Sequence, residues 1–95
     1  MDLCIVPIGV GTSLSQYITE CEKIIQKKGL TCLLHAYGTN IEGPWDEVME
    51  AVKECHEKIH QMGAPRINTI IKLGTRTDKK QTIQDKIDSV ESKLR

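Results

Sequence analysis

The chain has 95 residues, of which 39% are hydrophobic, and its 13 basic residues balance its 13 acidic ones. This length and composition predict a single domain over residues 1–95, small enough to gain stability from association with another subunit. The chain carries no net charge and has one Trp, two Tyr and no Phe. These features argue against nucleic acid or an anionic membrane as the main partner.

The apolar run that starts at Leu3 is too short to span a membrane, and it lacks the flanking features of a signal peptide. The cysteines, Cys4, Cys21, Cys32 and Cys55, are isolated, with no C-x-x-C pair. This spacing favours reduced, mostly buried thiols over a disulfide framework. We therefore expect a cytoplasmic protein.

The first predicted elements are a strand and a helix. Residues 3–8 form a strand that is apolar on both faces and is broken at Gly9. Apolar residues then recur at helical spacing, which predicts an amphipathic helix over 14–28. Ser13 is its expected N-cap, and Gln16 completes a capping box.

Two short strands and a second helix follow. The strands cover 31–36 and 39–42, and Tyr37-Gly38 forms the turn of a hairpin. The second helix is predicted to carry Pro44 at its first position. Its expected inner face consists of Trp45, Val48, Met49, Val52, Cys55, Ile59 and Met62.

A fourth strand over 66–74 precedes a last helix, for which Asp78 is the expected N-cap. The apolar stripe of this helix is thin, which favours packing across a sheet edge or onto another subunit. The order β-α-β-β-α-β plus a terminal helix predicts an α+β, ferredoxin-like fold with an antiparallel sheet.

The first strand also predicts an oligomer. Helices cover only one face of the sheet in this fold, yet Leu3 and Ile5 point one way while Cys4, Val6 and Ile8 point the other. Exposing such side chains would forfeit roughly 1.5–3 kcal/mol each. We expect a second copy to cover this face with its own sheet, giving a homo-oligomer. Cover by the terminal helix of the same chain is the alternative.

The sequence offers no convincing catalytic pattern. Residues 56–60 match the zinc motif H-E-x-x-H, but the remaining histidine, His35, lies upstream, and half-exposed surface residues are the better interpretation. Residues 9–11 read G-x-G but lack the rest of a phosphate loop. Cys32 and His35 fall on opposite faces of a strand. We expect no catalytic residue, metal or cofactor; an acylphosphatase-like hydrolase would rest on fold analogy alone.

Residues 35–46 carry more polar and aromatic residues than a scaffold needs. Glu42 is expected on the open side of the sheet, where its carboxylate requires a partner. A cationic or amine-bearing ligand would serve, and so would Arg76 or Lys72. Trp45 could provide an apolar wall for such a ligand or could pack into the core.

Residues 72–80 form a second unusual segment. Arg76, Lys79 and Lys80 cluster near the expected start of the last helix, where the helix dipole does not favour positive charge. The cluster suits an anion site or, equally, a solvated charged loop capped by Asp78.

Four stretches of the chain carry a family resemblance: residues 6–9, 38–48, 66–72 and 74–79. They occur in family order and span nearly the whole chain. The most specific is the run Gly-Thr-Asn-Ile-Glu-Gly-Pro-Trp-Asp within 38–46. With these stretches, the chain resembles the small thiamine-binding protein family.

The resemblance implies a ferredoxin-like fold, dimers joined into a tetramer through sheets, and a site for thiamine or its hydroxymethylpyrimidine part near subunit contacts. We therefore expect the chain to be a non-enzymatic binding protein for this ligand. The alternative is a regulatory protein that binds sulfate or a phosphoester. Glu42 could accept from the ligand amine or balance its charge, and Tyr37 or Trp45 could stack on a ring. The candidate ligand residues are His35, Tyr37, Thr39, Asn40, Glu42, Trp45, Arg76 and Lys79.

Overall fold

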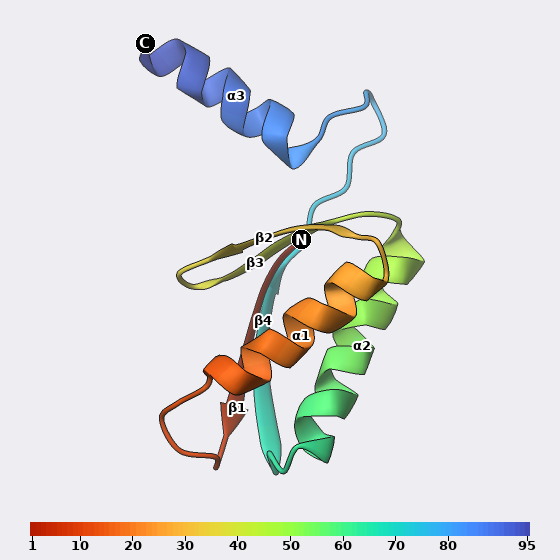
Figure 1. Cartoon of the computed structure of the whole chain (residues 1–95). Coiled ribbons are helices and arrows are strands. Elements are labelled where there is room, and N and C mark those ends of the chain that lie inside the picture. The colour runs from red at the N-terminus through yellow and green to blue at the C-terminus, as the bar shows by residue number, and fades with distance from the viewer.

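The computed structural model describes all residues, 1–95. Two helices pack on one face of a four-stranded antiparallel sheet with strand order β2-β3-β1-β4, and a third helix stands apart (Figure 1). The predicted ferredoxin-like arrangement is confirmed. The elements are β1 (Asp2–Ile8), α1 (Ser15–Lys27), β2 (Thr31–His35), β3 (Gly38–Glu42), α2 (Trp45–Gln61), β4 (Arg66–Lys72) and α3 (Ile83–Leu94). None of the three helices combines the length and apolarity needed to cross a bilayer.

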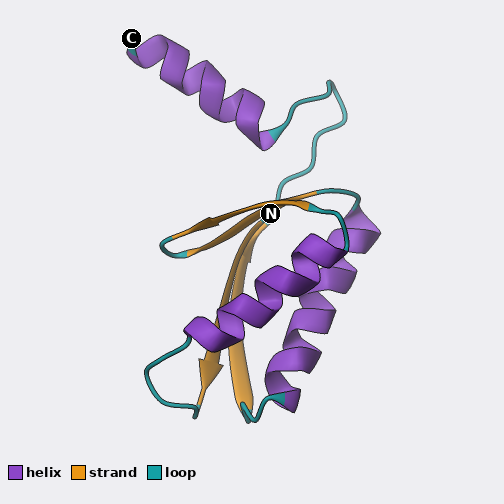
Figure 2. Cartoon of the chain, viewed as in Figure 1, coloured by secondary structure: helices purple, strands orange, loops and turns teal.

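The hydrophobic core lies between the sheet and helices α1 and α2, which Figure 2 shows on the same side of the strands. Alternation along the strands turns Leu3, Ile5 and Ile41 into this layer. The helices contribute one buried stripe each: Tyr17, Cys21 and Ile25 from α1, and Val48, Ala51, Val52, Cys55 and Ile59 from α2.

The opposite face of the sheet, here called the open face, has no cover within the chain. Its centre is apolar, because Cys4 and Val6 of β1 lie beside β4, where Cys4 pairs with Ile70. The side chain of Ile70 is 58% exposed. Helix α3 lies beyond the end of the sheet, and none of its residues is buried. The same-chain cover considered from the sequence is therefore not what the structure shows.

The β2–β3 hairpin diverges from β1 soon after the N-terminus. Met1 and Ile41 of β3 form two backbone hydrogen bonds with each other, both of 2.8 Å. Because backbone groups alternate along a strand, the N–H and C=O groups of Leu3, Ile5 and Pro7 point to this same edge of β1, the edge next to β3. The register with β3 reaches only Leu3, whereas β1 pairs with β4 over its whole length. Pro7 has no N–H to donate on the unpaired side, which suits a strand edge that faces no partner.

The starts of the first two helices differ from prediction. Helix α1 has Leu14 at its N-cap, and Ser13 makes no capping bond. The reason is that the Leu14 carbonyl accepts the N–H groups of Tyr17 and Ile18, so the first turn closes after Ser13. Pro44 is the N-cap of α2 rather than its first helical residue, because its ψ of 144° is extended.

Helix α3 also begins later than predicted. Thr82 is the N-cap and forms a reciprocal capping box with Asp85, at 3.0 Å in both directions. Asp78 was expected in this role, but Arg76 holds its carboxylate through bonds of 2.6 and 3.0 Å. The Asp78 carboxylate therefore forms a bidentate ion pair with the Arg76 guanidinium and does not cap the helix.

Two residues of the expected inner face of α2 are not in the core. Trp45 is 54% exposed, and Met49 is also exposed. Both lie beside the buried stripe of α2, which includes Val48, Val52 and Ile59. The reason is that residues three or four apart on a helix of 3.6 residues per turn share a face only approximately. They form part of the site described below.

Polar contacts fasten each helix to the sheet. The Thr39 hydroxyl donates to Glu22 of α1 at 2.5 Å, and Nε2 of His56 in α2 lies 2.6 Å from the Thr69 hydroxyl of β4. Burial and, after it, the neighbouring His60 lower the pKa of His56. The folded state therefore favours neutral His56.

Ile59→Ala should destabilise the chain by about 2–5 kcal/mol, because the Ile59 side chain is fully buried at the α2–sheet interface. Urea denaturation followed by circular dichroism measures the change. Leu94→Ala is the matched control, since Leu94 is 79% exposed on α3. Equal losses for the two variants would contradict this description of the core.

Acid should reduce stability through His56. Its pKa is lower when folded than the ordinary value of 6.5, so the unfolded chain binds the proton more readily. The stabilising contribution of neutral His56 is complete above pH 6.5 and is lost as the pH falls below 6.5 through the lower pKa of the folded state. Unfolding free energies across this pH range should fall less steeply for His56→Gln than for the parent; an unchanged slope would contradict the assignment.

Candidate functional site

The main cavity lies between the start of α2, the end of β3 and the segment that leads into α3, and it is called the α3 cleft here. Its volume is about 710 Å³. Four of the residues predicted from the sequence line it: Glu42, Trp45, Arg76 and Lys79. The structure thus brings together the two unusual segments, which lie about 30 residues apart along the chain.

Glu42 is the carboxylate at the centre of the cleft. Because Ile41 is buried in the core, Glu42 falls on the opposite side of β3, as predicted. Its Oε2 accepts the backbone N–H of Ile83 at 2.6 Å. Within the chain, the partner of Glu42 is therefore the first N–H of α3, where the helix dipole favours a carboxylate, and not Arg76 or Lys72, which the sequence offered beside a cationic or amine-bearing ligand. Oε1 makes no hydrogen bond within the chain, so it can accept one from a ligand.

Trp45 and Met49 provide the apolar wall of the α3 cleft. They stand one turn apart on α2, next to the end of β3 that carries Glu42. The half-exposed indole of Trp45 offers a flat surface to an aromatic or cationic group. Of the two roles considered for Trp45, the structure shows the wall rather than core packing.

The basic residues of the cleft fall into two groups. Arg76 is engaged by Asp78 and by the Gln81 side chain, and its guanidinium lowers the pKa of Asp78. Lys79 has no ion-pair partner, and the same holds for two further lysines of the cleft, Lys80 and Lys86. Sequence reasoning missed Lys86, which looks like an ordinary exposed residue of the last helix until its position is known.

Three other predicted residues, His35, Tyr37 and Thr39, line a separate cavity of about 320 Å³, the hairpin groove, between α1, β1 and the β2–β3 turn. Most of its lining is apolar. Tyr37 is 86% exposed at its rim. The eighth predicted residue, Asn40, lies on the open face and lines neither cavity.

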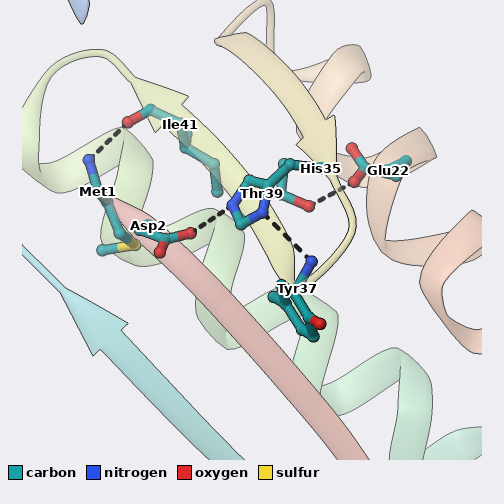
Figure 3. Close-up of polar contacts among 7 residues, drawn as sticks. All are labelled: Met1, Asp2, Glu22, His35, Tyr37, Thr39 and Ile41. Carbon is teal, nitrogen blue, oxygen red and sulfur yellow. Dashed lines mark hydrogen bonds and ion pairs between the residues drawn. The ribbon is translucent and has the colours of Figure 1, made fainter.

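The polar groups around the hairpin groove are largely satisfied within the chain (Figure 3). His35 Nδ1 accepts the Tyr37 N–H at 3.3 Å, which leaves Nε2 to donate to Asp2 at 2.8 Å. Thr39 points into the helix layer and donates to Glu22. The α3 cleft, with the free oxygen of Glu42 and three unpaired lysines, has the greater capacity for a polar ligand.

The histidines of the H-E-x-x-H stretch have separate partners. His56 contacts Thr69, and His60 Nδ1 donates to the Ala64 carbonyl at 2.8 Å. No three side chains of the His, Cys, Asp and Glu types cluster in a way that could hold a metal ion. The four cysteines are free. A hydrogen bond with Cys21 and burial raise the pKa of Cys55, which keeps this thiol protonated and unreactive.

Comparison with known proteins places these features in a family. The family model described as "thiamine-binding protein" matches residues 1–91. The chain is 55% identical to the UPF0045 protein sll0230 of Synechocystis, over 99% of this chain and 78% of that protein. It is 52% identical to the UPF0045 protein ECM15 of Eremothecium gossypii, over 99% and 90% of the two chains. The description of the family refers to binding, and these names refer to no reaction.

Solved structures share the fold. Protein MJ1052 of Methanocaldococcus jannaschii superposes with a TM-score of 0.88 at 31% identity, covering 95% of this chain and 92% of that one. A Thermotoga maritima protein, whose name refers to thiamine biosynthesis or salvage, gives a TM-score of 0.79 at 22% identity, with 94% of each chain covered. The family match over 91 residues, together with the fold, shows that this chain belongs to the thiamine-binding protein family.

Proposed function

We propose that this chain is a non-enzymatic binding protein for thiamine or its hydroxymethylpyrimidine part, and that the ligand binds in the α3 cleft. One observation carries the proposal: the free Oε1 of Glu42 and the exposed indole of Trp45 line the same cavity. The family description supports a thiamine-type ligand, and the name of the Thermotoga neighbour is consistent with one.

The chemistry of the ligand matches these two groups. Thiamine carries an aminopyrimidine, whose amine can donate to Oε1, and a thiazolium ring, whose positive charge the carboxylate can balance. Either ring can lie against the Trp45 indole. The volume of about 710 Å³ falls in the usual range of small-molecule sites, roughly 300–1,000 Å³.

The residues that line the α3 cleft support binding rather than catalysis. The carboxylate of Glu42 has no second carboxylate, histidine or cysteine beside it among the residues that line the cavity. Carboxylate pairs and Cys–His or Ser–His pairs, which are common arrangements for acid–base and nucleophilic catalysis, are therefore not among these residues. Binding without turnover is the function that these residues support.

We also propose that the protein works as a homotetramer in the cytoplasm. Two apolar surfaces are left without cover: the open face around Ile70, and the stripe of α3 that carries Val90 and Leu94. One surface can join two copies into a dimer, and the second can join the dimers. The α3 cleft is lined by Glu42, on the open side of β3, and by Ile83, at the start of α3, so its ligand would sit near subunit contacts. Four free cysteines suit a reducing compartment.

Glu42→Gln should weaken thiamine binding by about 1–3 kcal/mol, because it removes the charge that faces the ligand amine or cation. Trp45→Ala should also weaken it, by about 1 kcal/mol, through loss of stacking. Isothermal titration calorimetry with thiamine and with hydroxymethylpyrimidine measures both. Matched controls are Glu57→Gln, an exposed carboxylate outside the cleft, and Tyr37→Ala, at the rim of the hairpin groove.

If Tyr37→Ala abolished thiamine binding and Glu42→Gln left it unchanged, the ligand site would be the hairpin groove and not the α3 cleft. Absence of binding by the parent chain would reject the proposed function itself.

Ile70→Lys should yield smaller particles than the parent protein, because a charge on the open face opposes burial against a second sheet. Leu34→Lys is the matched control: Leu34 is equally exposed, at 58%, but faces the other side of the sheet. Analytical ultracentrifugation gives the masses. A monomeric parent protein would contradict the proposed assembly.

A further inference from the structure

The α3 cleft concentrates positive charge on a chain that is neutral overall. Four basic side chains line it, against a single carboxylate, Glu42. Asp78 and Gln81 already engage Arg76. The other three, Lys79, Lys80 and Lys86, line the same cavity without an ion pair; among all lysines of the chain, only Lys23 and Lys28 form one.

These lysines lie around Glu42 for a structural reason. The hydrogen bond from Ile83 to Glu42 fixes the first turn of α3 at the cleft. Lys86 follows Ile83 by three residues and so lies on the same side of the helix. Lys79 and Lys80 belong to the loop that closes the cavity before α3 begins.

The charge pattern does not fit a ligand that is only cationic. Thiamine brings one positive charge, which Glu42 can balance but which three unpaired ammonium groups oppose. A phosphate monoester carries a charge of about −1.5 to −2 near neutral pH and offers strong acceptor oxygens. A ligand with a cation or amine at one end and a phosphate at the other would satisfy both parts of the cleft.

We propose that the α3 cleft recognises the phosphate ester of its thiamine-type ligand, an inference that rests on the function proposed above. The ring end contacts Glu42 and Trp45, and Lys79, Lys80 and Lys86 bind the phosphoryl oxygens. At the start of α3, the N–H groups of Thr82, Ile83 and Asp85 already donate to Asp85, Glu42 and Thr82, so the lysine ammonium groups supply most of the phosphate contacts.

Calorimetric titration of the full chain with three probes tests the inference: thiamine, thiamine monophosphate and inorganic phosphate. The monophosphate should bind about tenfold or more tightly than thiamine, and the advantage should shrink as salt is added. The triple variant Lys79→Gln, Lys80→Gln, Lys86→Gln should abolish the advantage by lowering the affinity for the monophosphate. Lys27→Gln, Lys53→Gln, Lys93→Gln, which changes three exposed lysines outside the cleft, should keep it.

The outcomes separate this inference from the function on which it rests. Equal affinities for thiamine and its monophosphate would overturn phosphoester recognition and leave thiamine binding intact. If inorganic phosphate bound as tightly as the monophosphate and thiamine did not bind, the site would be a plain anion site and both proposals would fail. A monophosphate advantage that survives the triple cleft variant would also overturn the assignment to these lysines.

Discussion

A sheet that is covered by helices on one face only imposes the main constraint on this molecule. Every strand must divide its residues between a dry side and a side that its own chain leaves open. In β3 this division falls between Ile41, which is buried in the core, and Glu42, which reaches the edge of the open side. A one-residue change of register would exchange the two, placing a carboxylate in the core and removing it from the α3 cleft.

Glu42 links the body of the domain to α3. That helix has no buried residue, and its capping box satisfies only its own first turn. The bond of 2.6 Å from the Ile83 N–H to Glu42 ties the helix to the sheet at the point where the cleft opens. The carboxylate oxygen that holds α3 and the one that remains free belong to the same group, so ligand binding and the position of α3 depend on one side chain.

The two cavities differ in how many of their polar groups are already hydrogen-bonded or ion-paired within the chain. Around the hairpin groove, His35 and Thr39 are held by Asp2 and Glu22, and the rest of the lining is mostly apolar. In the α3 cleft, a carboxylate oxygen and three ammonium groups remain without partners. Recognition of a small polar molecule requires polar groups around a concave surface that are not paired within the chain, because such groups can exchange water for ligand contacts.

The order of the elements, the fold class, the apolar strip of the open face and the family could all be predicted from the amino-acid sequence. Hydrophobic periodicity and turn residues are local signals, and the run around Glu42 and Trp45 is specific. The N-caps of the helices could not be predicted in the same way. Asp78 is a suitable residue type for an N-cap, but its carboxylate binds Arg76 instead. Such competition depends on side-chain rotamers, which the spacing of residues in the sequence does not reveal.

Which candidate residues share a cavity became clear from the folded chain alone. It placed Arg76 and Lys79 beside Glu42, moved His35, Tyr37 and Thr39 to a separate groove, and added Lys86. The physical reason is that the path of residues 73–82 and the direction of α3 are set by a few long-range contacts, above all the Glu42–Ile83 hydrogen bond, which joins residues 41 positions apart. Local sequence patterns carry no information about a contact of that range.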